Sequence, residues 1–141
     1  MIPRPQQALN DLAMKLIGSV APQTQSTYAA SNAGMIAMLM QCLAQEFDRA
    51  AAVRTQDIDE LIALFESLRD VPPESLTSRL GTFSRGSAES LRIEHLNVRH
   101  AQGMELLIEL HAWAETHRAE ELDREIWSFL TRHADRHAFQ L

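Results

Sequence analysis

Apolar side chains recur at intervals of three and four residues along most of the chain, which is the spacing of an amphipathic helix rather than of a strand. Glycine and proline, which interrupt helices, are concentrated in a few places. The pattern therefore predicts an all-α protein. The predicted helices cover residues 6–19, 25–53, 56–70, 87–117 and 119–139, with a short helical turn at 74–80.

Local signals set the expected boundaries of these helices. Thr55 is a favourable N-cap and separates the second predicted helix from the third. Residues 81–86 begin and end with glycine and are predicted as a loop, after which Ser87 starts the longest helix. Neither glycine nor proline marks Arg118, so the last two helices are expected to be either separate or continuous through a kink.

Four substantial helices and a shorter N-terminal one, joined by connections of a few residues, are typical of an up-and-down antiparallel helical bundle. A chain of 141 residues is also the size of one ordinary domain. We therefore expect a single helical-bundle domain over residues 1–141.

The second predicted helix contains most of a run without any charged residue or histidine, from Leu16 to Gln45. Its most apolar part is too short and too often interrupted by polar residues to span a membrane. A helix without a charged face is usually central in its fold or buried between subunits. Two interpretations follow: the centre of a monomeric bundle, or a homodimer interface in which the small residues Ala30, Gly34 and Ala37 meet a second copy.

The composition limits the classes of binding partner and the cellular compartment that we expect for the protein. The chain has 13 basic and 19 acidic residues and a net charge of -6, which argues against binding to nucleic acid or to an anionic membrane surface. The single cysteine, Cys42, cannot form an internal disulfide. We therefore expect a cytoplasmic protein that binds neither nucleic acid nor membrane.

Two histidines lie on the apolar stripe of the helix predicted at 87–117. His100 and His111 are separated by close to three helical turns, so they share one face but lie roughly 16 Å apart, too far to bind one ion together. One interpretation is a metal or small-ligand site near His100, Met104 and His111, with Glu115 one turn after His111. The other is that both histidines are held by polar neighbours in the core, and no cofactor is predicted.

Two pairs with a spacing of four, His111 with Glu115 and His133 with His137, are similar to part of the haemerythrin pattern. That family needs such pairs at the same level on adjacent helices, whereas these would lie roughly 18 Å apart along the helix axes. The first two predicted helices also contain no histidine. The chain is therefore not assigned to the family, and His133 and His137 are expected on a solvated C-terminal turn, where cationic groups complement the helix dipole.

An anion site is a further candidate in the segment between the third and fourth main helices. Arg79 and Arg85, together with several hydroxyl groups, precede the helix N-terminus expected at Ser87. The alternative is an exposed linker in which Ser87 is only the N-cap.

No nucleotide-binding glycine loop, metal-spaced cysteine set or nucleophile elbow is present, so the sequence assigns no reaction. The leading hypothesis is a small cytoplasmic helical-bundle protein that homodimerises through its uncharged second helix and acts as an accessory or interaction module, with a protein partner that the sequence does not identify. The alternative is a metal- or small-ligand-binding bundle, with or without catalysis.

Overall fold

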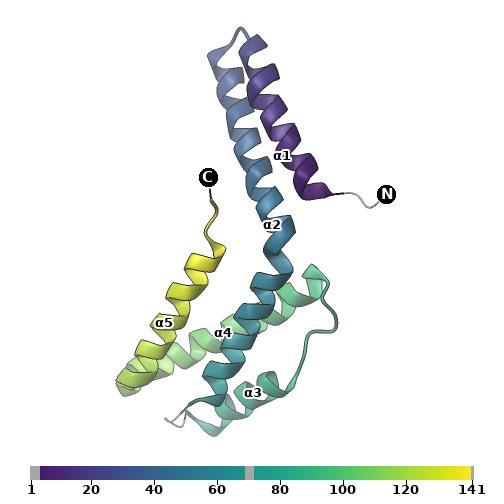
Figure 1. Ribbon diagram of the computed structural model, residues 1–141. Helices are drawn as coiled ribbons and strands as arrows, with labels where there is room; N and C mark the ends of the chain where they lie inside the picture. Colours follow the sequence, from purple (N-terminus) through teal and green to yellow (C-terminus); the bar gives the residue numbers. More distant parts are fainter. Residues whose placement is uncertain (1–3, 69–71, 141) are drawn as a thin grey trace. The chain divides into compact units, whose positions relative to one another are not determined.

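The computed structural model describes residues 4–68 and 72–140, and these residues form helices and connecting segments but no strand (Figure 1). The prediction of an all-α fold is confirmed, and the up-and-down order stays a prediction. A π-helical turn, Leu16–Val20, and a 3-10 turn, Ala21–Gln23, follow the first helix. The α-helices are α1 (Pro5–Lys15), α2 (Thr27–Glu66), α3 (Glu74–Arg85), α4 (Ile93–His117) and α5 (Glu120–His137).

The second and third predicted helices are one helix, so the predicted boundary at Thr55 is wrong. Helix α2 runs without interruption for 40 residues, from Thr27 to Glu66. Its sequence contains no proline, and its one glycine, Gly34, lies far from Thr55. An N-cap residue can begin a helix, but it does not break one whose flanking residues all tolerate helical geometry. The expected end of this helix at residue 70 lies outside the described residues.

The connection between α2 and α4 also differs from the prediction. Helix α3 continues to Arg85, through most of the expected loop, and α4 begins at Ile93 rather than Ser87. The apolar stripe Leu76, Leu80 and Phe83 is buried, and this burial outweighs the cost of about 1 kcal/mol for a glycine inside a helix. The guanidinium of the buried Arg99 then caps α3 by donating hydrogen bonds to the carbonyl oxygens of Phe83 and Gly86.

Helices α4 and α5 are separate. Arg118 adopts a left-handed conformation with φ of 54°, which ends α4 and reverses the chain within a few residues. The alternative of one continuous helix is therefore excluded.

The chain divides into two compact units, one formed by residues 1–50 and 139–141 and the other by residues 51–138. We call them the N-terminal unit and the C-terminal unit and describe each by itself. The expectation of a single domain over 1–141 stays a prediction. No helix in the described ranges combines the length and apolar character needed to cross a bilayer.

In the N-terminal unit, α1 and the first half of α2 lie side by side in opposite directions (Figure 1). Among the described residues of this unit, the fully buried hydrophobic ones are all alanines: Ala13, Ala33, Ala37, Ala44 and Ala50. Most of its large apolar side chains are instead at least two-fifths exposed, with Tyr28 at 77%, while Leu9, Leu16 and Met40 are partly buried. Alanines allow two helices to approach closely, but they bury little surface.

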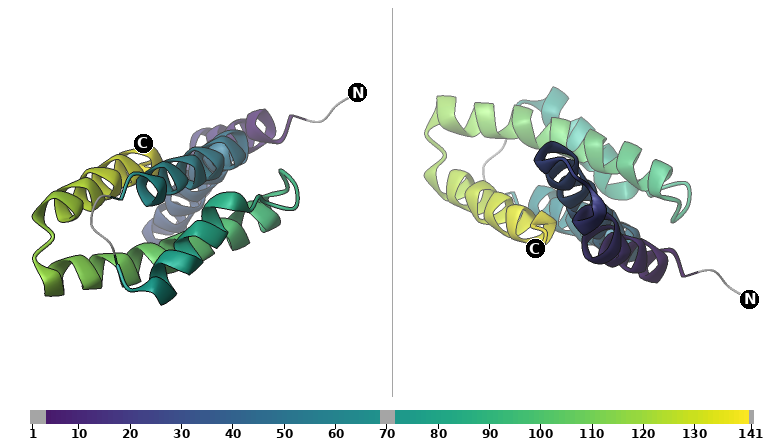
Figure 2. Two further views of the ribbon diagram at one scale, coloured as in Figure 1. Left: turned by 90° about the horizontal axis from the view of Figure 1, so that it is seen from below. Right: turned by 90° about the horizontal axis from the view of Figure 1, so that it is seen from above.

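The C-terminal unit has an ordinary apolar core. Helix α4 packs against both α3 and α5 (Figure 2). Helix α4 approaches the core most closely at Gly103, where an added Cβ would lie 2.7 Å from Phe83 Cζ and 2.8 Å from Leu61 Cδ1. The core cluster consists of Ile58, Leu61, Leu64, Phe65, Leu76, Leu80, Phe83, Leu96, Leu106, Leu107, Leu110, Ala114, Leu122, Ile126 and Phe129.

The close approach at Gly103 predicts that Gly103→Ala destabilises the C-terminal unit, because both neighbouring atoms belong to side chains that are buried in the core and have little room to move. We expect a loss of about 1–3 kcal/mol in the free energy of unfolding. Urea unfolding followed by the fluorescence of Trp113 and Trp127 measures it. The matched control is Gly81→Ala, where the nearest atom is the mobile Arg85 guanidinium at 3.2 Å; equal losses for both variants would contradict the packing argument.

Candidate metal centre

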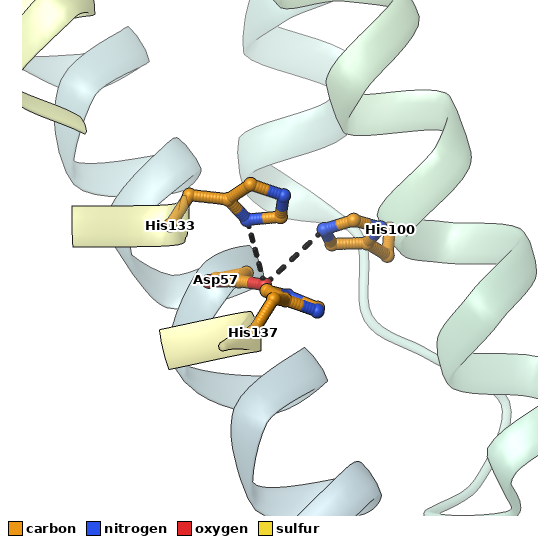
Figure 3. A group of neighbouring side chains, drawn as sticks. All are labelled: Asp57, His100, His133 and His137. Atoms are coloured by element: carbon orange, nitrogen blue, oxygen red, sulfur yellow. Dashed lines mark hydrogen bonds and ion pairs between the residues drawn. The ribbon is translucent and has the colours of Figure 1, made fainter. Parts of the chain in front are cut away.

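Three histidines surround one buried carboxylate in the C-terminal unit (Figure 3). The Asp57 side chain is completely buried. Its Oδ2 atom lies 2.7 Å from His137 Nε2, 3.0 Å from His133 Nδ1 and 3.3 Å from His100 Nε2. All four ligand-type atoms lie within 4.8 Å of one another.

Helical periodicity brings these residues together. Asp57 precedes the buried Leu61 by one turn of α2, so the carboxylate points into the core. In α4, His100 follows the buried Leu96 by one turn. In α5, His133 follows the buried Phe129 by one turn, and His137 comes one turn later. Each residue therefore lies on the inward face of its helix, and the three faces converge.

The imidazole rings pack against each other and against the core. The His133 ring centroid lies 4.2 Å from that of His137 and 5.4 Å from that of His100. The His133 and His100 rings are nearly parallel, with 17° between their planes. The Phe129 ring stacks on His133 at 5.8 Å. Side-chain exposures of 17% for His100 and 29% for His137 leave the cluster partly open to solvent.

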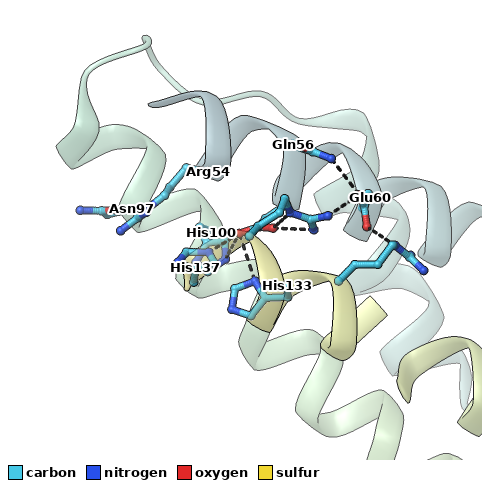
Figure 4. Close-up of polar contacts among 10 residues, drawn as sticks. Arg54, Gln56, Glu60, Asn97, His100, His133 and His137 are labelled. Atoms are coloured by element: carbon cyan, nitrogen blue, oxygen red, sulfur yellow. Dashed lines mark hydrogen bonds and ion pairs between the residues drawn. The ribbon is translucent and has the colours of Figure 1, made fainter. Parts of the chain in front are cut away.

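The second oxygen of Asp57 is held by an arginine. Arg136 Nε donates a hydrogen bond to Asp57 Oδ1 at 2.9 Å, and Arg136 Nη1 donates one to Glu60 Oε1 at 2.7 Å (Figure 4). Glu60 Oε2 in turn accepts a hydrogen bond from Arg132 Nε at 3.0 Å. This network fixes the Asp57 carboxylate so that Oδ2 faces the three imidazoles.

The electrostatics favour an ionised carboxylate beside neutral imidazole. Burial alone would raise the pKa of the Asp57 carboxyl, but the three imidazoles and the Arg136 guanidinium outweigh this effect and hold the pKa well below its usual value. Burial lowers the pKa of His133 by more than the negative charge of Asp57 raises it. Ionised carboxylate and neutral imidazole are the protonation states that bind metal ions.

The cluster has the donor set and nearly the dimensions of a tetrahedral metal site. With ligand bonds of about 2.0–2.1 Å, ligand atoms around a tetrahedral ion lie about 3.3–3.4 Å apart. The three nitrogens lie 2.7–3.3 Å from Asp57 Oδ2, so a small outward movement would make room for an ion. His100 Nε2 is buried and makes no hydrogen bond to any described residue. Its nearest polar contact is Asp57 Oδ2, at 3.3 Å, so this nitrogen also faces the site.

The structure separates the histidines that the sequence singled out. His100 belongs to the cluster, whereas His111 Nε2 pairs with Asp123 Oδ1 at 2.9 Å. Glu115 Oε1 lies 4.0 Å from His111 and its side chain is largely exposed. Met104 packs against the apolar core. The residues proposed around His100, Met104 and His111 are therefore distributed over two places.

The arginines proposed for an anion site are likewise not gathered at one point. Both lie on α3, and Arg79 forms a two-point ion pair with Glu109 at 2.5 and 2.8 Å. The Arg85 guanidinium lies beside Gly81. The anion site stays a prediction without support from these contacts.

The proposed dimer residues lie in the N-terminal unit. Ala37 is completely buried inside that unit, while Ala30 and Gly34 are partly exposed. An added Cβ on Gly34 would meet nothing within 4 Å.

Sequence reasoning missed Asp57, His133 and His137 as members of one site. Asp57 lies in the first turn of the helix predicted at 56–70, a position where an exposed acid complements the helix dipole. His133 and His137 were expected in a solvated turn, but they are only partly exposed and both contact Asp57. The sequence signal that could have placed both histidines on the buried side is helical spacing, because they continue the three- and four-residue intervals of Ile126 and Phe129.

The buried Asp57 carboxylate predicts a strong effect of its removal on stability. In metal-depleted protein, Asp57→Ala should lower the free energy of unfolding by about 3 kcal/mol or more, because Arg136, only 14% exposed, loses a charge partner. Urea unfolding monitored by tryptophan fluorescence measures the loss. The matched control is Asp59→Ala on the exposed side of α2, expected to change stability by less than about 0.5 kcal/mol. A similar small effect of Asp57→Ala would show that the ion-pair network is energetically unimportant.

Comparison of the chain with protein-family models, with curated protein sequences and with solved structures gives no match. Inference about function therefore rests on the chemistry of the residues themselves.

Proposed function

We propose that this protein binds one divalent transition-metal ion, with Zn²⁺ as the ion that the donor set suits best, through Asp57, His100, His133 and His137. One observation carries the proposal: three imidazole nitrogens converge on a single oxygen of a buried carboxylate. Three histidines and one aspartate are common ligand types for zinc, and imidazole also suits other first-row metals.

The proposed ligand atoms are Asp57 Oδ2, His100 Nε2, His133 Nδ1 and His137 Nε2. In the metal-free protein, the ring nitrogens that contact Asp57 carry protons, because an ionised carboxylate can only accept hydrogen bonds. Two imidazoles lie within 3.0 Å of Asp57 Oδ2, whereas His100 Nε2 lies at a longer 3.3 Å. A metal ion would take the place of the ring protons that face Asp57, each proton moving to the other nitrogen of its ring, and would give all three nitrogens the same partner.

Ligand orientation is already largely determined without the ion. Arg136 holds Asp57 Oδ1, so the carboxylate would bind the ion through one oxygen. Such outer-shell partners typically account for 10–100-fold in metal affinity (about 1.4–2.8 kcal/mol). The network from Asp57 through Arg136 to Glu60 therefore supports the proposal.

Four protein ligands complete a tetrahedral coordination shell, which is typical of metal sites that stabilise structure. The ligands come from α2, α4 and α5, so the ion would join three helices at one point. We therefore propose that metal binding stabilises the C-terminal unit. No reaction is assigned to the ion.

The expectation of a homodimeric accessory module in the cytoplasm remains a second proposal. All four metal ligands belong to one chain, so metal binding by itself requires no second copy. The observation that favours dimerisation is the exposure of large apolar side chains in the N-terminal unit. The small-ligand alternative near His100, Met104 and His111 has no comparable support, because these residues do not converge.

The metal proposal predicts binding of one Zn²⁺ per chain to metal-depleted protein, measured by isothermal titration calorimetry. His133→Ala should weaken binding by at least about 100-fold, since changes outside the ligand shell already cost 10–100-fold. Titration with Co²⁺ gives an independent test, because its visible absorption intensifies in a tetrahedral site.

The matched control for this titration is His111→Ala. His111 lies on α4 like His100, has a similar exposure of 20%, and pairs with Asp123 outside the cluster. It should bind Zn²⁺ as the natural sequence does. Loss of binding in His111→Ala but not in His133→Ala would overturn the assignment of ligands, and an absence of stoichiometric binding would overturn the proposal.

Zn²⁺ should also raise the melting temperature of the protein, because an ion that binds only the folded state stabilises it by mass action. At a free concentration 100 times the dissociation constant, the gain is about 2.7 kcal/mol. Thermal unfolding followed by circular dichroism, with and without Zn²⁺, measures the shift, and a chelator should reverse it. His137→Ala should show a much smaller shift; an equal shift in that variant would mean that Zn²⁺ stabilises the protein from another site.

A further inference from the structure

The N-terminal unit exposes a continuous set of large apolar side chains on α2. The Tyr28 side chain is 77% exposed and that of Leu39 is 54% exposed. Their neighbours on the same side of the helix are exposed to a similar degree. The set consists of Tyr28, Met35, Ile36, Leu39, Leu43 and Phe47, and we call it the apolar face of α2.

Helical phase shows that this is one face. At 100° per residue, Met35 and Leu39 lie within about 20° of Tyr28, and the other three residues lie to one side within about 100°. The buried Ala33 and Ala37 lie on the opposite side, at about 140° and 180° from Tyr28. The alanine face therefore packs inside the unit, whereas the face with the large side chains has no cover.

Residues from α1 and the turn after it add to the uncovered apolar surface. Leu12 and Met14 are 52% and 61% exposed, and Ile17 and Val20 are slightly less exposed. A helical hairpin that buries only alanines loses most of the stabilisation that these larger side chains could supply, which is about 1.5–3 kcal/mol for each one fully buried.

We infer that the apolar face of α2 is a homodimer interface, and that a second copy of this chain covers it. Two helical hairpins paired in this way would form a four-helix arrangement with a common apolar interior. This inference rests on the dimer proposal above but places the interface on the apolar face instead of at Ala30, Gly34 and Ala37. It is independent of metal binding, because every residue of the apolar face belongs to residues 1–50 and every proposed metal ligand to residues 51–138.

Charge favours a second copy as the partner. All residues of the apolar face except Phe47 lie within residues 16–45, which carry no charged group, so over most of this face two copies can meet without like-charge repulsion and without burying an unpaired ion. A two-fold interface uses the same patch on both subunits and so needs a patch that is complementary to itself, as an uncharged apolar face is.

The exposed area is sufficient for a specific contact. Full burial of a large apolar side chain removes about 60–120 Å² from water. The half-exposed residues of α1, the following turn and α2 together therefore offer about 500 Å² per copy, or about 1,000 Å² for the pair. The total of about 1,000 Å² reaches the lower limit of specific interfaces, and about 500 Å² per copy lies toward the upper end of the largest apolar patches on monomers, which are often functional.

The test compares the same charge introduced on two faces of one helix, in the full chain. Leu39→Arg places an arginine on the apolar face, and Gly34→Arg places one on the small-residue side, where an added Cβ has open space. Sedimentation equilibrium of the natural sequence at micromolar concentration should give the mass of a dimer. Leu39→Arg should raise the dimer dissociation constant by about 100-fold or more, and Gly34→Arg should leave it nearly unchanged.

Two further measurements separate dissociation from unfolding and from loss of metal binding. Tyr28→Arg alters a side chain too exposed to support the monomer fold, so it should dissociate the dimer with an unchanged circular dichroism spectrum. Monomeric Leu39→Arg should bind Zn²⁺ as the natural sequence does, which keeps this test independent of the metal proposal. A natural sequence that is monomeric at all concentrations, or a dimer disrupted by Gly34→Arg and not by Leu39→Arg, would overturn the inference.

Discussion

The Asp57 carboxylate is the group on which the arrangement of the C-terminal unit depends. A completely buried carboxylate is costly to remove from water, and it is tolerated only when several donors compensate its charge. Here the two oxygens have separate partners, with Arg136 at Oδ1 and the imidazoles at Oδ2. Because these partners lie on α4 and α5, satisfying one charge fixes the relation of three helices.

Periodicity predicted the helical class and most of the helices, because each apolar stripe is a local property of the sequence. It failed where tertiary burial decided the outcome. The N-cap signal of Thr55 had no effect inside a helix without a breaking residue, and Gly81 did not end α3 because Leu80 and Phe83 are buried. Favourable caps and single glycines change helix stability by about 1 kcal/mol, which is less than the burial of one large apolar side chain contributes.

The candidate site was harder to predict, for a related reason. His100 could be placed on an inward face from the stripe of α4 alone. The role of Asp57 depended on knowing that α2 continues through residues 53–56, since only then does an acid expected near a helix end lie in the interior. The meeting of residues from α2, α4 and α5 is a matter of tertiary packing, and no local pattern encodes it.

The two units differ in which apolar side chains they bury. The C-terminal unit encloses leucine and phenylalanine side chains and buries a compensated charge, whereas the N-terminal unit encloses alanines and leaves most of its large apolar residues exposed. Helix α2 is the α-helix that belongs to both. Metal binding and association could affect each other energetically through an element that adopts two arrangements. Each of the two events would then have to favour one arrangement over the other. The proposed metal ligands and the apolar face of α2 belong to different units and share no residue, so we expect metal binding and association to be independent.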